Sequence, residues 1–201
     1  MKLAIQRRSI YLEPPRGMDV IWVTRQLSHP EIAENFAWGD DLTPADICGG
    51  HRIGAVIVGM MRRVVDGARM GFVLMLCPHE GKDFWEILAA IPDVRHRDAF
   101  SMMHAIDAMS HYMFDHLGAP RCGATVKPEN AASLAVVRRI GYRQREIRPD
   151  SDGVPHAVYV LDPEAWAQRR ARLERGETEH PSGAGAAFVV LPGPPYTPVR
   201  A

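Results

Sequence analysis

A cationic segment marks a junction where the sequence changes character. Arg95, His96 and Arg97 follow an apolar, strand-like run at residues 84–91 and precede a run with helical periodicity at residues 97–117. The first turn of a helix carries backbone N–H groups without intrahelical partners and the positive end of the helix dipole. We therefore expect an anion site at this junction, and we expect function to be located there.

Glu86 lies in the strand-like run that leads to this junction. A partly buried glutamate with a raised pKa is suited to general acid–base chemistry. Side chains alternate along a strand, so if Trp85 and Ile87 point to the core, Glu86 faces the opposite side of the sheet. That side is either a cleft or solvent, and the pattern leaves both alternatives open.

A second helix is predicted at residues 130–140, with Asn130 as its N-cap and Ser133 at the third helical position. Gly141 stands where a left-handed residue commonly ends a helix. Capping alone explains Asn130 and Ser133, and it is compatible with a ligand contact at the same helix start.

The helix predicted at residues 97–117 carries a stripe of four polar residues. His104, Asp107, His111 and Asp115 are spaced three, four and four residues apart, opposite an apolar stripe. Such spacing allows metal chelation, but a stripe opposite the apolar face most often faces water. We expect solvent exposure and no metal site.

The cysteines indicate neither a zinc site nor a disulfide framework. Cys48, Cys77 and Cys122 form no CxxC pair and are odd in number. No G-x-S-x-G motif occurs, and Cys77 and Cys122 lie in apolar runs, so a covalent nucleophile is not expected. Free cysteines favour a reducing, cytoplasmic location.

The composition is that of an ordinary globular protein, with 46% hydrophobic and 24% charged residues in 201. Lys plus Arg equals Asp plus Glu at 24 each, so no global field favours nucleic acid or an anionic membrane. The longest apolar runs are far shorter than the ~20 residues of a membrane-spanning helix, and the N-terminus lacks a signal-peptide pattern. We expect one domain with extensions and no membrane or nucleic-acid partner.

The remaining patterns predict alternating strands and helices. A strand interrupted by Gln6-Arg7-Arg8 is expected at residues 3–12, a helix at 18–27, a second short helix after the break at 28–31 towards Trp38, and a helix starting at Thr43-Pro44. Asp66-Gly67 predicts a hairpin between strands at 53–65 and 71–77. Further strands are expected at 84–91, 121–126, 142–147 and 156–161, with a turn at 150–153 and a charged helix at 164–175. The Pro- and Gly-rich tail is expected to be disordered or draped over the surface, although residues 187–191 could add a strand.

These motifs resemble the GNAT superfamily, in the branch that contains ribosomal-protein N-terminal acetyltransferases. The matching segments, covering residues 3–168, are His29-Pro30-Glu31-Ile32, Phe84-Trp85-Glu86-Ile87, Leu117-Gly118, Asn130-Ala131-Ala132-Ser133, Arg139-Ile140-Gly141-Tyr142 and Trp166. The resemblance implies an α/β fold with a mixed, mostly antiparallel central sheet flanked by helices. It divides the chain into a GNAT-like domain at 1–168 and a C-terminal helix end and tail at 169–201.

The resemblance also implies an activity, the transfer of an acyl group from acetyl-CoA or another acyl-CoA to a primary amine of a small molecule or peptide. It makes Glu86 the base that relays a proton from the amine, and Ser133 a group that assists the leaving thiolate. The residues implied in cofactor binding are Ile91, Arg95, His96, Arg97, Asp98, Ala99, Phe100, Asn130 and Ser133.

The sequence departs from the family at the pyrophosphate loop. The usual pattern Q/R-x-x-G-x-G/A aligns with residues 95–100, so Asp98 replaces the first glycine and Phe100 the small residue. Asp98 brings a carboxylate to the site and can cap the helix in place of a ligand anion, whereas Arg95 and Arg97 keep the loop cationic.

Two hypotheses of different classes follow. The first is an acyl-CoA-dependent N-acyltransferase; the alternative is a GNAT-fold binding or assembly module that has lost CoA binding and catalysis. The acceptor amine and the oligomeric state stay open, with a homodimer among the alternatives.

Overall fold

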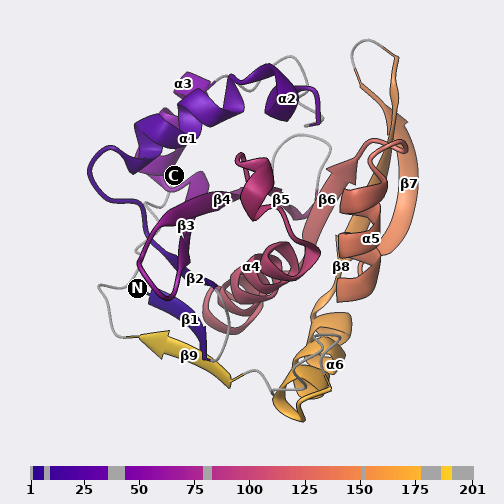
Figure 1. Cartoon of the computed structure of the whole chain (residues 1–201). Coiled ribbons are helices and arrows are strands. Elements are labelled where there is room, and N and C mark those ends of the chain that lie inside the picture. The colour runs from indigo at the N-terminus through magenta and orange to yellow at the C-terminus, as the bar shows by residue number, and fades with distance from the viewer. Residues whose placement is uncertain are drawn as a thin grey trace.

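The structure is a computed structural model that describes residues 2–6, 10–35, 44–78, 83–150, 153–177 and 187–191 (Figure 1). The predicted segment towards Trp38, the Thr43 cap, the polar connection at 79–82 and the centre of the turn at 151–152 lie outside these residues. Within them, no helix is both long and apolar enough to cross a membrane.

The described strands form one sheet in the order β7-β8-β6-β5-β4-β3-β2-β1-β9. They are β1 (Lys2–Gln6), β2 (Ile10–Glu13), β3 (Val56–Arg63), β4 (Arg69–Leu76), β5 (Trp85–Ala90), β6 (Cys122–Val126), β7 (Arg143–Pro149), β8 (Pro155–Leu161) and β9 (Ala187–Leu191). Of the described pairs, β5 and β6 run parallel and the others antiparallel. The predicted mixed, mostly antiparallel sheet is confirmed.

Helices cover both faces of this sheet, as Figure 1 shows with α1, α2 and α3 above the strands and α4 below them. The helices are α1 (Asp19–Leu27), α2 (Pro30–Ala33), α3 (Pro44–Ile53), the 3-10 helix η1 (Val94–His96), α4 (Ala99–His111) with its π-helical extension η2 (Tyr112–His116), α5 (Ala131–Ile140) and α6 (Pro163–Glu174). Each face of the sheet therefore has its own apolar core.

Alternation along the central strands divides these two cores. In β4, Phe72 and Leu74 pack with α1 and α3, whereas Val73 and Met75 pack with α4. In β5, Ile87 joins the α4 side. Because alternate residues point to opposite faces, the Glu86 side chain belongs to the face that carries α1 and α3.

Two predicted strands differ from the structure. The interrupted strand predicted at residues 3–12 is two strands, because β1 and β2 pair antiparallel, with Leu3 opposite Leu12. The strand predicted from Ile53 begins at Val56, because α3 extends to Ile53. By contrast, the Asp66-Gly67 hairpin is confirmed, with Gly67 at a φ of 68°.

The tail strand β9 pairs antiparallel with β1 along residues 187–191. Of the two alternatives for this segment, the structure therefore shows the added strand. Backbone pairing of this kind covers the edge that β1 would otherwise present.

The first half of the polar stripe, His104 and Asp107, does not face water, and for these two residues the prediction of solvent exposure is wrong. His104 is 3% exposed and Asp107 is fully buried. Arg169 of α6 donates to both carboxylate oxygens of Asp107, at 3.0 and 3.2 Å. Local periodicity missed this contact because α6 covers the stripe from a position 62 residues later in the chain.

The same helix pair is joined at its other end by Asp115 and Trp166. The Trp166 indole N–H donates to Asp115 at 2.9 Å, and the Trp166 ring is 1% exposed. His111 and Arg170 also contact the Asp115 carboxylate. A continuous polar seam thus attaches the C-terminal helix to α4.

Candidate active site

A pocket opens where the parallel strands β5 and β6 separate. Their pairing consists of two residue pairs, Trp85 with Cys122 and Glu86 with Gly123. Gly123 suits this point because an added Cβ would lie 2.2 Å from Cδ2 of the buried Phe84 ring. Beyond it the strands diverge and leave a pocket of about 550 Å³ between them.

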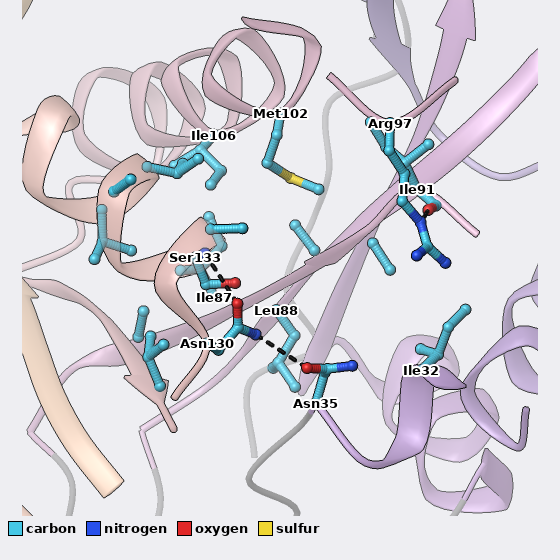
Figure 2. Close-up of a pocket in the computed structure, with 18 of the residues that line it drawn as sticks. Ile32, Asn35, Ile87, Leu88, Ile91, Arg97, Met102, Ile106, Asn130 and Ser133 are labelled. Carbon is cyan, nitrogen blue, oxygen red and sulfur yellow. Dashed lines mark hydrogen bonds between the residues drawn. The ribbon is translucent and has the colours of Figure 1, made fainter. Parts of the chain in front are cut away.

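The pocket has an apolar interior and a polar rim (Figure 2). Its walls come from five elements and the loop before α4. The lining residues are Glu31, Ile32 and Asn35; Glu86, Ile87, Leu88, Ala89, Ala90 and Ile91; Arg97, Asp98, Met102 and Ile106; Ala124, Thr125 and Val126; and Asn130, Ala132, Ser133, Ala135, Val136 and Val137.

Glu86 lines this pocket at the point where the strands separate. Its side chain is buried, at 6% exposed, and Oε1 accepts a hydrogen bond from Thr125 Oγ1 at 2.5 Å. Of the two alternatives for Glu86, the structure therefore shows a cleft and not solvent. A buried carboxylate that reaches a pocket can exchange a proton with a group bound there.

Asn130 and Ser133 form part of the wall that faces Arg97 (Figure 2). Asn130 caps α5 as predicted, because its Oδ1 accepts from the Ser133 backbone N–H at 3.0 Å. Gly141 ends the helix with a φ of 111°, also as predicted. The Asn130 side-chain amide also donates to Asn35 Oδ1 at 3.2 Å, which links α5 to the segment after α2.

Asp98 caps α4 at the predicted anion site. Its Oδ1 accepts from the Ser101 backbone N–H at 2.6 Å. The carboxylate therefore lies where the dipole and free amides of the helix start would attract a ligand anion.

The cations of the loop have partners of their own. The Arg97 side chain donates to the backbone carbonyls of Ile91, at 2.9 Å, and Pro92, at 2.8 Å. Arg95 donates to both carboxylate oxygens of Asp93. This side-chain contact, together with the Arg95 backbone N–H, holds the pKa of Asp93 well below its usual value.

The structure brings together most, but not all, of the predicted site residues. Glu86, Ile91, Arg97, Asp98, Asn130 and Ser133 line the pocket. In the described part of the chain, Arg95, His96 and Phe100 do not, and Phe100 packs against the core instead. The side chain of Ala99 lies outside the described part.

Three polar lining residues were missed as site residues. Thr125 interrupts an apolar strand, so alternation in residues 122–126 could have identified it. Glu31 and Asn35 are four residues apart, but α2 spans only Pro30–Ala33, so Asn35 lies beyond its end and no helical periodicity relates the two residues. No sequence pattern placed either residue beside residues of the later loop and helix.

Three carboxylates and one guanidinium give the pocket an acidic balance. Glu31, Glu86 and Asp98 line it together with Arg97. Glu31 Oε2 lies 3.7 Å from Arg97 Nη2, so these two charges partly offset each other at the rim. No group of three or more His, Cys, Asp or Glu side chains in the described residues is arranged to hold a metal ion.

Solved structures with this fold include acetyltransferases with CoA bound. RimJ of Mycobacterium smegmatis in complex with CoA-disulfide is 18% identical with a TM-score of 0.64, over 85% of this chain and 92% of that one. Aminoglycoside acetyltransferase AAC(6')-Ib in complex with coenzyme A is 16% identical with a TM-score of 0.64, over 81% and 99%. Ribosomal-protein-S5-alanine acetyltransferase of Vibrio fischeri is 12% identical with a TM-score of 0.61, over 80% and 97%.

At these identities the likeness establishes the fold. No curated protein sequence matches the chain. The family model described as the acetyltransferase (GNAT) domain matches residues 10–143, well over half of the 201 residues. Sequence motifs, sheet topology and this match agree, and the chain belongs to the GNAT acetyltransferase family.

Proposed function

We propose that the chain is an N-acyltransferase that moves an acetyl or other acyl group from a CoA thioester to a primary amine of a small molecule or peptide. One observation carries this proposal: a mainly apolar pocket between diverging parallel strands has the buried Glu86 among its lining residues. Such a pocket suits an extended, mainly uncharged arm, and the carboxylate suits a proton transfer with a group bound there.

The reaction would proceed by direct attack. The amine loses a proton to Glu86, its nitrogen forms a bond to the thioester carbonyl carbon, and the carbon–sulfur bond breaks. The departing thiolate takes a proton from the Ser133 hydroxyl in the wall of the pocket, and the second proton, which the nitrogen loses as the amide forms, restores that hydroxyl through water. Much of the acceleration would come from holding the two reactants in line.

Relatives with the same fold support the class of reaction and leave the acceptor open. Two neighbours have coenzyme A or its disulfide bound; one of these two is an aminoglycoside acetyltransferase, and a third neighbour is a ribosomal-protein-S5-alanine acetyltransferase. These acceptors share an amine and little else. The proposal is therefore limited to a primary amine.

The test measures release of free thiol from acetyl-CoA in the presence of a panel of primary amines. Substituting Glu86→Gln removes the base but keeps a hydrogen-bond acceptor for Thr125, so we expect kcat to fall by about 10²- to 10⁴-fold. Glu146→Gln serves as the control, because Glu146 is exposed on β7 and pairs with Arg148. Equal kcat for Glu86→Gln and the unaltered protein would remove Glu86 from the mechanism.

A binding measurement separates this proposal from the alternative of a binding module. A ligand that binds only the folded state raises the melting temperature. If neither CoA nor its pantetheine fragment stabilises the protein at millimolar concentration, the acyltransferase proposal fails and the module remains.

A further inference from the structure

Two parts of the candidate site differ in how open they are to a ligand. One is the pocket for the thioester arm; the other is the pyrophosphate loop at residues 95–100 with the start of α4, which we call the cradle. Between β5 and β6 the pocket is open and mainly apolar. At the start of α4, the Ser101 N–H and the side chains of Arg95 and Arg97 already have partners within the chain. This difference affects which part of an acyl donor, the thioester arm or the pyrophosphate, contributes most to binding.

The carboxylate of Asp98 has the strongest effect on the cradle. It accepts the Ser101 N–H at 2.6 Å, and Asp98 also lines the pocket. A negative charge at this position is stabilised by the helix dipole, and it repels a second anion placed at the same helix start. A pyrophosphate would have to lie beside this carboxylate or displace it from its amide.

The two arginines do not compensate fully for Asp98. Arg97 donates to the Ile91 and Pro92 carbonyls and lies 3.7 Å from Glu31, while Arg95 is bound to Asp93. Figure 2 shows the Arg97 side chain beside Ile91, across the pocket from Asn130 and Ser133. Exposed ion pairs such as those of Arg95 and Arg97 break at little cost, so each arginine can still turn to a phosphate. Asp98, however, keeps its charge at the helix start whichever way they turn.

We propose that this protein holds its acyl donor by the pantetheine arm and thioester, and that a pyrophosphate at the far end of the donor adds little to binding. The inference rests on the proposed function and narrows it. The donor class it names is an acyl thioester of a pantetheine arm, either free or carried as phosphopantetheine on a carrier protein.

Isothermal titration calorimetry with CoA, 4′-phosphopantetheine and pantetheine tests this without an acceptor amine. We expect the three dissociation constants to agree within about tenfold. A working cradle makes several charge-assisted hydrogen bonds to the phosphates, each of which contributes about tenfold or more. CoA binding about a hundredfold or more tighter than pantetheine would therefore overturn the inference while leaving the acyltransferase proposal intact.

If none of the three ligands binds, the proposed function is wrong, and the inference is wrong with it. A fourth ligand, a small acyl carrier protein in its phosphopantetheine-bearing form, distinguishes the two sources of the arm. Tighter binding than free 4′-phosphopantetheine supports a carrier-borne donor, and equal binding supports a free one.

The variant Asp98→Asn separates the effect of the Asp98 charge from the role of this residue as the N-cap of α4. Asparagine is as good an N-cap as aspartate, so α4 should keep its start while the negative charge is lost. We expect CoA affinity to rise about threefold or more relative to pantetheine affinity. Asp162→Asn is the matched control, because Asp162 caps α6 through the Ala165 N–H at 2.8 Å and does not line the pocket. An unchanged ratio of the two affinities in Asp98→Asn would show that the carboxylate does not oppose the pyrophosphate, and would overturn the inference.

Discussion

Loss of the Asp107 charge should destabilise the fold strongly. Asp107 is fully buried and receives two hydrogen bonds from Arg169, which is 5% exposed. Asp107→Asn leaves the Arg169 guanidinium buried without its counter-charge. Removing one partner of a buried ion pair typically costs about 3 to 5 kcal/mol.

The structure supplies a control of the opposite kind. Asp83 pairs with Arg121 and Arg145, but these side chains are all nearly half exposed. Exposed pairs contribute about 0 to 1 kcal/mol, so Asp83→Asn should be close to neutral. Both variants replace an aspartate with asparagine, so the difference between their losses of stability measures the effect of burial.

Thermal and urea unfolding provide the assay. For a chain of this size, each kcal/mol lowers the melting temperature by roughly 2 to 4 °C, so Asp107→Asn should melt about 6 to 20 °C lower. The double variant Asp107→Leu with Arg169→Met removes both charges and should recover most of the loss. The reasoning is refuted if Asp107→Asn lies within about 1 kcal/mol of the unaltered protein, or if the double variant is less stable than either single one.

Two further predictions concern the point of strand divergence and the seam between α4 and α6. Gly123→Ala places a Cβ 2.2 Å from the Phe84 ring, so we expect a loss of about 1 to 3 kcal/mol in urea unfolding and weaker pantetheine binding; unchanged stability would mean that the ring moves freely. Burial lowers the pKa of His111 from its usual 6.5, although the hydrogen bond to Asp115 works in the opposite sense. The unfolded chain then binds a proton more readily than the folded one, so His111 costs stability as pH falls below its usual pKa. The rise in melting temperature between about pH 5 and pH 8 should be smaller in His111→Gln, and an equal rise would contradict this assignment.

Features fixed by short-range chemistry were predictable from the sequence. Asn130, Asp98 and Gly141 occupy the helix ends expected of them, and Asp66-Gly67 forms the expected hairpin. In each case the side chain or backbone preference acts within four residues. Such preferences need no knowledge of the rest of the fold.

Features that depend on distant packing were not predictable. Periodicity showed that His104 and Asp107 share one side of a helix, but it carried no information about α6, which buries that side. In the same way, the residues of β1 and β2 are compatible with one strand or two, and antiparallel pairing decides between them. The contacts of Glu31 and Asn35 with Arg97 and Asn130 join segments more than sixty residues apart.

The pocket and the cradle differ in how they arise, and this explains why family membership predicts one better than the other. The pocket follows from sheet topology together with small lining residues, because the parallel pair separates after Glu86 and side chains such as those of Ala89 and Ala124 leave the gap open. The cradle depends on two side-chain positions, and Asp98 and Phe100 change both without disturbing the helix they precede. A protein with this fold can therefore keep the pocket for the thioester arm while its contacts to the pyrophosphate of the donor change. For this chain, the residues at the start of α4, more than the family fold, indicate which acyl donor binds.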